Sequence, residues 1–247
     1  MREPADEFFV GYLPVPMRLR TFLRAAMLLL IVIAGVGAAL IASGQRDPGT
    51  GKWDLDDPSE TIGVIGEAPY PVLRTASATI LLIDQGKVGA VDRVKGLQGR
   101  TVKIRGTRIE RESVRLIELA EDPGAIQTID GETTADPIVT TDGATIVLRG
   151  EIVDPKCHSG AMKPGDGKTH KACATLCIRG GIPPVLIDDA QRRFLLVDHA
   201  GGALTGESLD AILPFVGDRV EVSGVIQRQG DLVMLLIDSA HLHRLTP

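Results

Sequence analysis

Apolar residues follow two different patterns along the chain, one near the N-terminus and one from about residue 60 onward. Residues 25–44, AAMLLLIVIAGVGAALIASG, contain no charged side chain. A helix of this length spans about 30 Å, which matches the hydrocarbon core of a bilayer. A buried core helix is rarely apolar on every side for so long, and the apolar region of a signal peptide is shorter, about 7 to 15 residues. The pattern therefore predicts a transmembrane helix over residues 25–44.

The charges on either side of this segment predict its orientation. The residues before it are basic (Arg2, Arg18, Arg20 and Arg24), and those after it are mainly acidic (Asp47, Asp54, Asp56, Asp57 and Glu60). Because positive charge stays on the cytoplasmic side, we expect residues 1–24 to be cytoplasmic and the remainder to be exported. Interpreted as bacterial, the chain is predicted to be a single-pass protein of the inner membrane with its C-terminal domains in the periplasm.

After a linker at residues 45–59, the chain consists of short β-type segments separated by glycine and turn residues. In TVKIRG (101–106) and RVEVSG (219–224), apolar and polar side chains alternate with the period of two that is typical of strands. A stretch rich in Asp, Thr, Gly and Pro, residues 122–143, forms a second linker. We expect a mainly β fold with one domain at 60–121 and another at 144–247.

These two segments resemble each other, which predicts a tandem duplication. Four pairs of stretches recur in the same order: TIGVIGEAPYP (61–71) with TIVLRGEIVDP (145–155), ILLIDQGKVGAVD (80–92) with PVLIDDAQRRFLLVD (184–198), GRTVKIRG (99–106) with GDRVEVSG (217–224), and VRLIELA (114–120) with VMLLIDSA (233–240). The succession of about five strands predicts small Greek-key barrels of the OB type, with an open β-sandwich as the alternative.

The second segment carries an insertion that the first lacks. All three cysteines and two of the five histidines lie in CHSGAMKPGDGKTHKACATLC (157–177), whereas residues 60–121 contain neither residue type. Alignment of the two segments makes the second longer by about 20 residues in this region. Because a barrel forms without this stretch in the first segment, we expect the Cys and His residues to serve function rather than folding.

Three of these residues are predicted to share one face of a short helix. His170, Cys173 and Cys177 are spaced i, i+3 and i+7, with Thr169 as the expected N-cap and Gly180 as the terminating glycine. The upstream candidates are Cys157 and His158, at the end of a strand, and Met162, in a Pro/Gly-rich loop, with Asp154 as a supporting group around them.

This set of side chains predicts a metal centre. Soft sulfur with imidazole suits copper, zinc or an iron–sulfur cluster, and copper is favoured because Cys, Met and His together suit Cu(I) in an exported domain. Zinc usually has C-x2-C knuckles, which the chain lacks, and no C-x2-C-H motif for c-type haem occurs. A disulfide between Cys157 and Cys177, or a redox-active thiol beside His170 and Lys171, are the alternatives.

Other features are less informative. The net charge of −5 argues against nucleic acid as a partner. No Ser/His/Asp triad or phosphate-binding loop stands out. The remaining histidines, His199, His241 and His243, are more typical of solvated surface positions.

The stretch GEIVDPKC…GKTHKACATLCIRGGIPP resembles a motif of bacterial exported or membrane-anchored proteins of uncharacterised function. These carry a Cys, then H-x2-C-A-x2-C and G-x-P, followed by strands of a small barrel. The resemblance covers about residues 145–240 and implies an exported OB-like domain. It implies no established activity and no catalytic residue.

The sequence thus leads to two hypotheses. The first is a membrane-anchored periplasmic protein that binds copper and serves electron transfer or metal delivery to a respiratory or redox complex. The second is a non-catalytic accessory or assembly subunit whose inserted loop is stapled by a disulfide. Neither hypothesis requires an enzymatic activity.

Overall fold

The computed structural model describes residues 15–45, 51–54, 58–129 and 139–245. The first 14 residues and parts of the two expected linkers lie outside this range. The chain divides into two units, residues 1–47 and 48–247.

The N-terminal unit contains one long helix, α1 (Met17–Gly44), of 28 residues. It includes the whole apolar segment expected at residues 25–44 and three of the arginines before it. None of its residues is buried within the structure. The helix is long and apolar enough to cross a membrane, a property that membrane anchors and signal sequences share.

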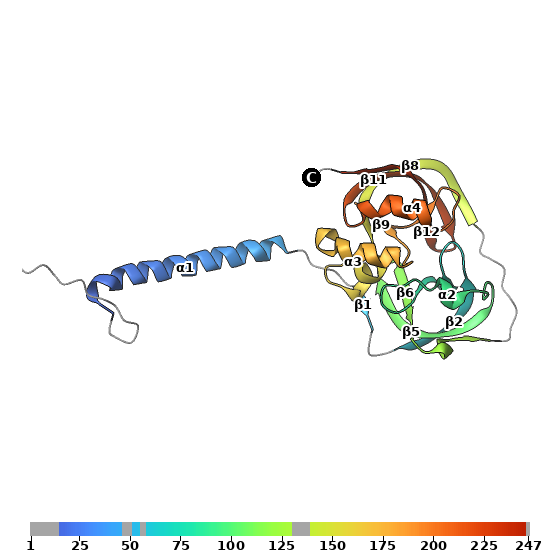
Figure 1. Cartoon of the computed structure of the whole chain (residues 1–247), viewed down its shortest axis with the longest axis horizontal. Coiled ribbons are helices and arrows are strands. Elements are labelled where there is room, and N and C mark those ends of the chain that lie inside the picture. The colour runs from blue at the N-terminus through green and yellow to red at the C-terminus, as the bar shows by residue number, and fades with distance from the viewer. Residues whose placement is uncertain (1–14, 46–50, 55–57, 130–138, 246–247) are drawn as a thin grey trace, which may run out of the picture. The chain divides into compact units, whose positions relative to one another are not determined.

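The second unit is mainly β and contains two closed five-stranded barrels (Figure 1). The strands of the first barrel are β2 (Ser59–Gly66), β3 (Val72–Arg74), β4 (Thr79–Ile83), β5 (Thr101–Arg111) and β6 (Val114–Leu119). Two short strands, β1 (Lys52–Trp53) and β7 (Ile126–Thr128), add to β5. The helix α2 (Val91–Val94) lies between β4 and β5 in the chain, and the 3-10 turn η1 (Pro123–Ala125) follows β6.

The second barrel is built from β8 (Val139–Val153), β9 (Val185–Asp188), β10 (Arg193–Asp198), β11 (Arg219–Gln229) and β12 (Leu232–Arg244). A π-type turn, η2 (Cys157–Ala161), and the helix α3 (Gly167–Arg179) lie between β8 and β9. The helix α4 (Gly206–Ile212) and the 3-10 turn η3 (Leu213–Phe215) lie between β10 and β11.

The two barrels pair their strands in the same order. In each, the first strand pairs with the second and fourth, the third pairs with the second, and the fifth closes the ring by pairing parallel to the third and antiparallel to the fourth. Single hydrogen bonds also recur at matching places: Leu82 N–H donates to Pro71 O and Leu196 N–H donates to Pro184 O. Strand order and these bonds are therefore common to both barrels.

This pairing corrects one detail of the internal alignment. It makes β4 the counterpart of β10, so that PVL at residues 71–73 corresponds to PVL at residues 184–186, and the stretch beginning at residue 80 has its counterpart near residue 194. The connection between the first two strands covers residues 67–71 in one barrel and 154–184 in the other. The whole cysteine-rich stretch is thus an insertion between the first and second strands.

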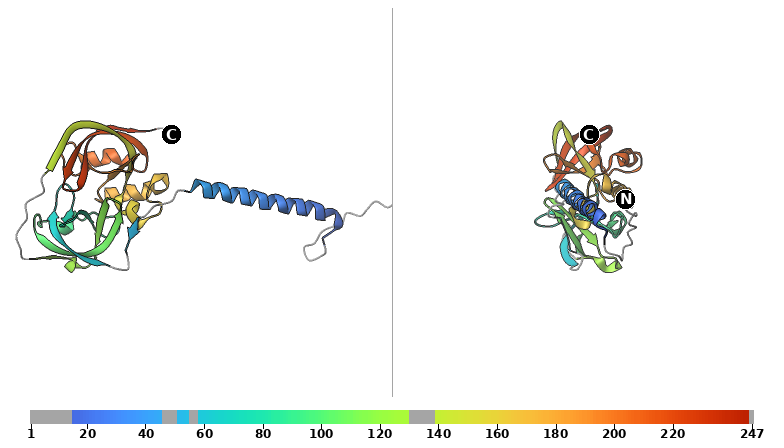
Figure 2. Two further views of the ribbon diagram at one scale, coloured as in Figure 1. Left: turned by 180° about the vertical axis from the view of Figure 1, so that it is seen from behind. Right: turned by 90° about the vertical axis from the view of Figure 1, so that its left-hand side faces the viewer.

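The barrels are joined by a shared apolar core. Each barrel has its own buried cluster, and a third cluster combines side chains from both, among them Val72, Leu81, Val185 and Leu195. The phenol of Tyr70 donates to Leu196 O and accepts from Leu204 N–H, both at 3.0 Å. The three views show the barrels side by side, with α3 at their junction (Figures 1 and 2).

Candidate metal centre

The turn that follows β8 directs Cys157 into the protein. The amide of His158 donates to Asp154 O at 3.0 Å, and the amide of Met162 donates to Cys157 O at 3.2 Å. The carboxylate of Asp154 accepts from the amide of Lys156 at 2.9 Å, which secures the start of the turn. Asp154 and Cys157 are both buried as a result.

The helix predicted with Thr169 as its N-cap is present as α3, although it begins three residues earlier. Its N-cap is Asp166, and the amide of Gly167 donates to the carboxylate of Glu151 at 2.5 Å. This carboxylate comes from β8 and satisfies a free amide of the first turn, so the helix starts before the Thr169 expected from local sequence. The helix ends at Arg179, directly before Gly180, as expected.

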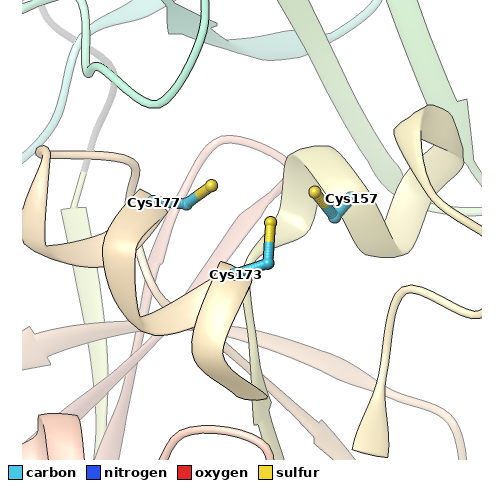
Figure 3. A group of neighbouring side chains, drawn as sticks. All are labelled: Cys157, Cys173 and Cys177. Carbon is cyan, nitrogen blue, oxygen red and sulfur yellow. The ribbon is translucent and has the colours of Figure 1, made fainter. Parts of the chain in front are cut away.

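Three sulfur atoms converge between these two elements. The Sγ atoms of Cys157, Cys173 and Cys177 all lie within 4.8 Å of one another. Figure 3 shows Cys173 and Cys177 pointing from α3 toward Cys157 on the opposing turn. All three are free cysteines, with Cys157 and Cys177 buried and Cys173 partly exposed. The arrangement provides a set of three soft ligands, which suits a thiophilic metal ion.

The thiols of Cys157 and Cys177 interact with each other. The thiol of Cys157 donates a hydrogen bond to the sulfur of Cys177, and this bond together with burial raises the pKa of Cys157. The same hydrogen bond lowers the pKa of Cys177, to which the charge of Lys87 also contributes. A metal ion bound here would replace the thiol protons of its ligands.

A second group of candidate ligand atoms also includes the sulfur of Cys157. Its sulfur, a carboxylate oxygen of Asp154 and a ring nitrogen of His170 lie within 4.8 Å of one another, and all three residues are buried. Burial lowers the pKa of His170, which favours the neutral imidazole that metals require. The oxygen Oδ2 of Asp154 and Nε2 of His170 are buried without a hydrogen-bond partner in the described part of the chain.

His170 was expected to converge with Cys173 and Cys177, but it belongs to this second group. The seven residues from His170 to Cys177 advance about 10 Å along a helix, so two side chains on one face need not reach one point. Asp154, expected only as a supporting group, instead places a carboxylate oxygen among the candidate ligand atoms. The two groups therefore meet at Cys157.

The other predicted ligands are His158 and Met162. His158 is buried, but it belongs to neither group, and burial together with Arg111 and Arg193 lowers its pKa to about 3. The side chain of Met162 is 48% exposed. His199, His241 and His243 are exposed.

The first barrel contributes one residue that the sequence did not single out. The ammonium of Lys87, in the loop after β4, donates to the sulfur of Cys173 at 2.7 Å and lies 3.9 Å from that of Cys177. The hydrogen bond with Cys173 raises the pKa of Lys87. The site is thus closed on one side by a cation from the neighbouring barrel.

Fold and site together define a two-barrel protein with a thiol-rich candidate metal centre at the junction of its barrels. No protein family, curated protein or solved structure matches the chain.

Proposed function

We propose that this is a membrane-anchored, exported metal-binding protein whose three sulfurs hold a soft ion, Cu(I), for electron transfer or for delivery to a redox complex. The observation that carries the proposal is the convergence of Cys157, Cys173 and Cys177 within 4.8 Å, from two elements of an insertion that the first barrel does without. Thiolate ligands select Cu(I), zinc or iron–sulfur clusters, and the three-sulfur group offers no hard oxygen ligand.

The setting of the sulfurs supports such a role. Two of the three cysteines are buried, which limits exchange with solvent, while the partly exposed Cys173 leaves a route to a partner. Lys87 supplies a positive charge beside the sulfurs, which offsets part of the negative charge of three thiolates around a monovalent ion.

We further propose that both barrels are OB-type domains that arose by duplication. The support is their common strand order and the recurring hydrogen bonds, including Gly99 N–H to Ile65 O and Gly217 N–H to Ile152 O at 2.8 and 2.9 Å. A helix lies between the third and fourth strands of each barrel. The proposed anchor is α1, with the arginines at its start in the cytoplasm and the barrels in the periplasm.

The experiment is a titration of the full-length protein in detergent micelles with Cu(I), under anaerobic reducing conditions and in competition with a coloured chelator. We expect one ion per chain for the wild type. Cys173→Ser and Cys157→Ser should each hold this ion more weakly, because each variant removes one of the three sulfur ligands. His243→Gln, which changes an exposed imidazole, serves as the control. A wild type that takes no Cu(I) from the chelator would refute the proposal.

A second candidate function has one observation in its favour. The sulfurs of Cys157 and Cys177, which a staple of the inserted loop would join, lie within 4.8 Å of each other. An accessory subunit with this disulfide would show a single free thiol, Cys173, when the protein isolated from the membrane is alkylated without reductant and analysed by mass spectrometry. Three alkylated cysteines would exclude the staple.

A further inference from the structure

The group formed by Asp154, Cys157 and His170 has a feature that the three-sulfur group does not explain. Two of its polar atoms, Oδ2 of Asp154 and Nε2 of His170, are buried with no hydrogen-bond partner in the described part of the chain. Asp154 is 0% and His170 4% exposed. Buried polar atoms are normally paired, so two orphans in one cluster indicate a missing partner.

The missing partner is a cation on grounds of charge. A buried carboxylate is costly unless a positive charge or several donors compensate it. Asp154 accepts from the amide of Lys156 on its other oxygen and interacts with the thiols of Cys157 and Cys177, none of which carries a positive charge. The ammonium of Lys156 does not serve, because it donates to Glu118 and to Gly86 O. The ring nitrogen of His170 and the sulfur of Cys157 lie within 4.8 Å of the carboxylate, and each adds a lone pair but no positive charge.

We propose that a second metal ion binds Asp154, Cys157 and His170, and that the thiolate of Cys157 bridges it to the ion held by the three sulfurs. The inference rests on the proposed function, because the bridging sulfur is one of the three ligands of the first ion. It makes the centre binuclear, with two sites of different chemistry that share one atom.

The ligand types indicate which ion each site takes. The second site offers one sulfur, one nitrogen and one carboxylate oxygen, a combination that Zn²⁺ accepts and that the softer Cu(I) does not favour. The first site offers sulfur alone, which Cu(I) favours. The second ion is therefore a borderline divalent cation of the Zn²⁺ class, next to a soft monovalent ion.

Charge supports two ions over one. With its ligands deprotonated, the cluster holds three thiolates and one carboxylate against the single ammonium of Lys87. One Cu(I) leaves a net charge of about −2 in a buried site, whereas Cu(I) with Zn²⁺ brings the sum to about zero.

The experiment loads the full-length protein in detergent with Cu(I) to saturation and then titrates it with Zn²⁺ against a zinc chelator. We expect one Cu(I) and one Zn²⁺ per chain in the wild type. Asp154→Asn and His170→Gln should each retain Cu(I) and lose Zn²⁺, whereas Cys157→Ser should lose Zn²⁺ and also hold Cu(I) more weakly. Asp210→Asn and His243→Gln change exposed residues of the same types and should bind as the wild type does.

The outcomes separate the two proposals. A wild type that binds Cu(I) but no Zn²⁺, or one whose Zn²⁺ survives both Asp154→Asn and His170→Gln, overturns the second site and leaves the first. A wild type that binds no Cu(I) overturns the proposed function as well. Circular dichroism shows whether each variant folds, and should Asp154→Asn not fold, His170→Gln decides the question because it changes a different ligand of the same site.

Discussion

The ammonium nitrogen of Lys87 in the first barrel lies 2.7 Å from the sulfur of Cys173 on α3 of the second. The backbone of the same loop is also tied to the end of α3, because the amide of Gly89 donates to Gly180 O at 2.9 Å. The first barrel therefore completes the cysteine cluster although it supplies no cysteine or histidine. This relationship links the packing of the barrels to the chemistry of the site.

Replacement of Lys87 by Met should slow the alkylation of Cys173. The thiolate is the nucleophile, and the ammonium stabilises its negative charge through a charge-assisted hydrogen bond. A solvent-exposed contact of this kind contributes up to about 1 kcal/mol, so its loss should lower the rate by up to about fivefold. The rate for each cysteine is measured by mass spectrometry after timed exposure of the metal-free protein to iodoacetamide.

Lys95→Met is the matched control, because Lys95 is an exposed lysine of the same barrel. It should leave the rate at Cys173 unchanged. An equal rate in Lys87→Met and the wild type would mean that the contact does not influence the sulfur.

A methyl group at Gly180 should separate the barrels locally. The backbone of Gly180 has an ordinary φ of −77°, so alanine introduces no backbone strain. Its Cβ would, however, overlap the carbonyl oxygen of Lys87. We expect Gly180→Ala to lower the free energy of unfolding by about 1–3 kcal/mol, the usual cost of overpacking, in urea denaturation. Gly124→Ala, whose Cβ has more room, should cost less; equal stability of the two variants would contradict the tight contact.

Local patterns predicted much of this architecture. The period-two alternation in residues 101–106 and 219–224 lies within β5 and β11, because a barrel strand has one face in the core and one outside. The helical spacing of Cys173 and Cys177 likewise brings both sulfurs to the same side of α3. Strand alternation and helical spacing are set by residues that are close in the chain, so the sequence alone is enough to predict them.

The rest depends on contacts between distant segments. Lys87 reaches Cys173 only because the barrels share an apolar core, and no spacing in the chain encodes that approach. The role of Asp154 depends in the same way on the turn that returns Cys157 toward α3. The alignment of residue 80 with residue 184 was wrong because β9 and β10 are similar apolar strands that follow each other in the chain. The stretch at residue 80 can be aligned with either of them by sequence, and strand pairing shows that β10 is its counterpart.

The orientation of the chain is tested with a reporter that is active only in the periplasm. Fused after Pro247, it should be active, because the arginines at the start of α1 favour retention of that end in the cytoplasm. Replacing Arg18, Arg20 and Arg24 by Gln should reduce reporter activity, whereas the same change at Arg179, Arg192 and Arg193 should not alter the orientation. A well-expressed but inactive wild-type fusion would show the opposite topology.

Asp218 holds α3 against the second barrel, and its contribution to stability should depend on pH. Its carboxylate accepts from Lys171 on α3 at 2.6 Å and from Arg244 on β12 at 2.8 Å. Burial opposes ionisation, but these two cations outweigh it and lower the pKa of Asp218 below its usual 3.8. A carboxyl group with a lowered pKa stabilises the folded state above the unfolded-state value, and this stabilisation is lost as the pH falls through the folded-state value. We therefore expect Asp218→Asn to be less stable than the wild type by about 1 kcal/mol at pH 7, with the difference shrinking below about pH 4.

Urea denaturation at several pH values measures the free energy of unfolding of both proteins. Asp210→Asn, which changes an exposed carboxylate on α4, is the control. A difference that persists unchanged to pH 2.5 would show that the charge of Asp218 is not what stabilises the contact.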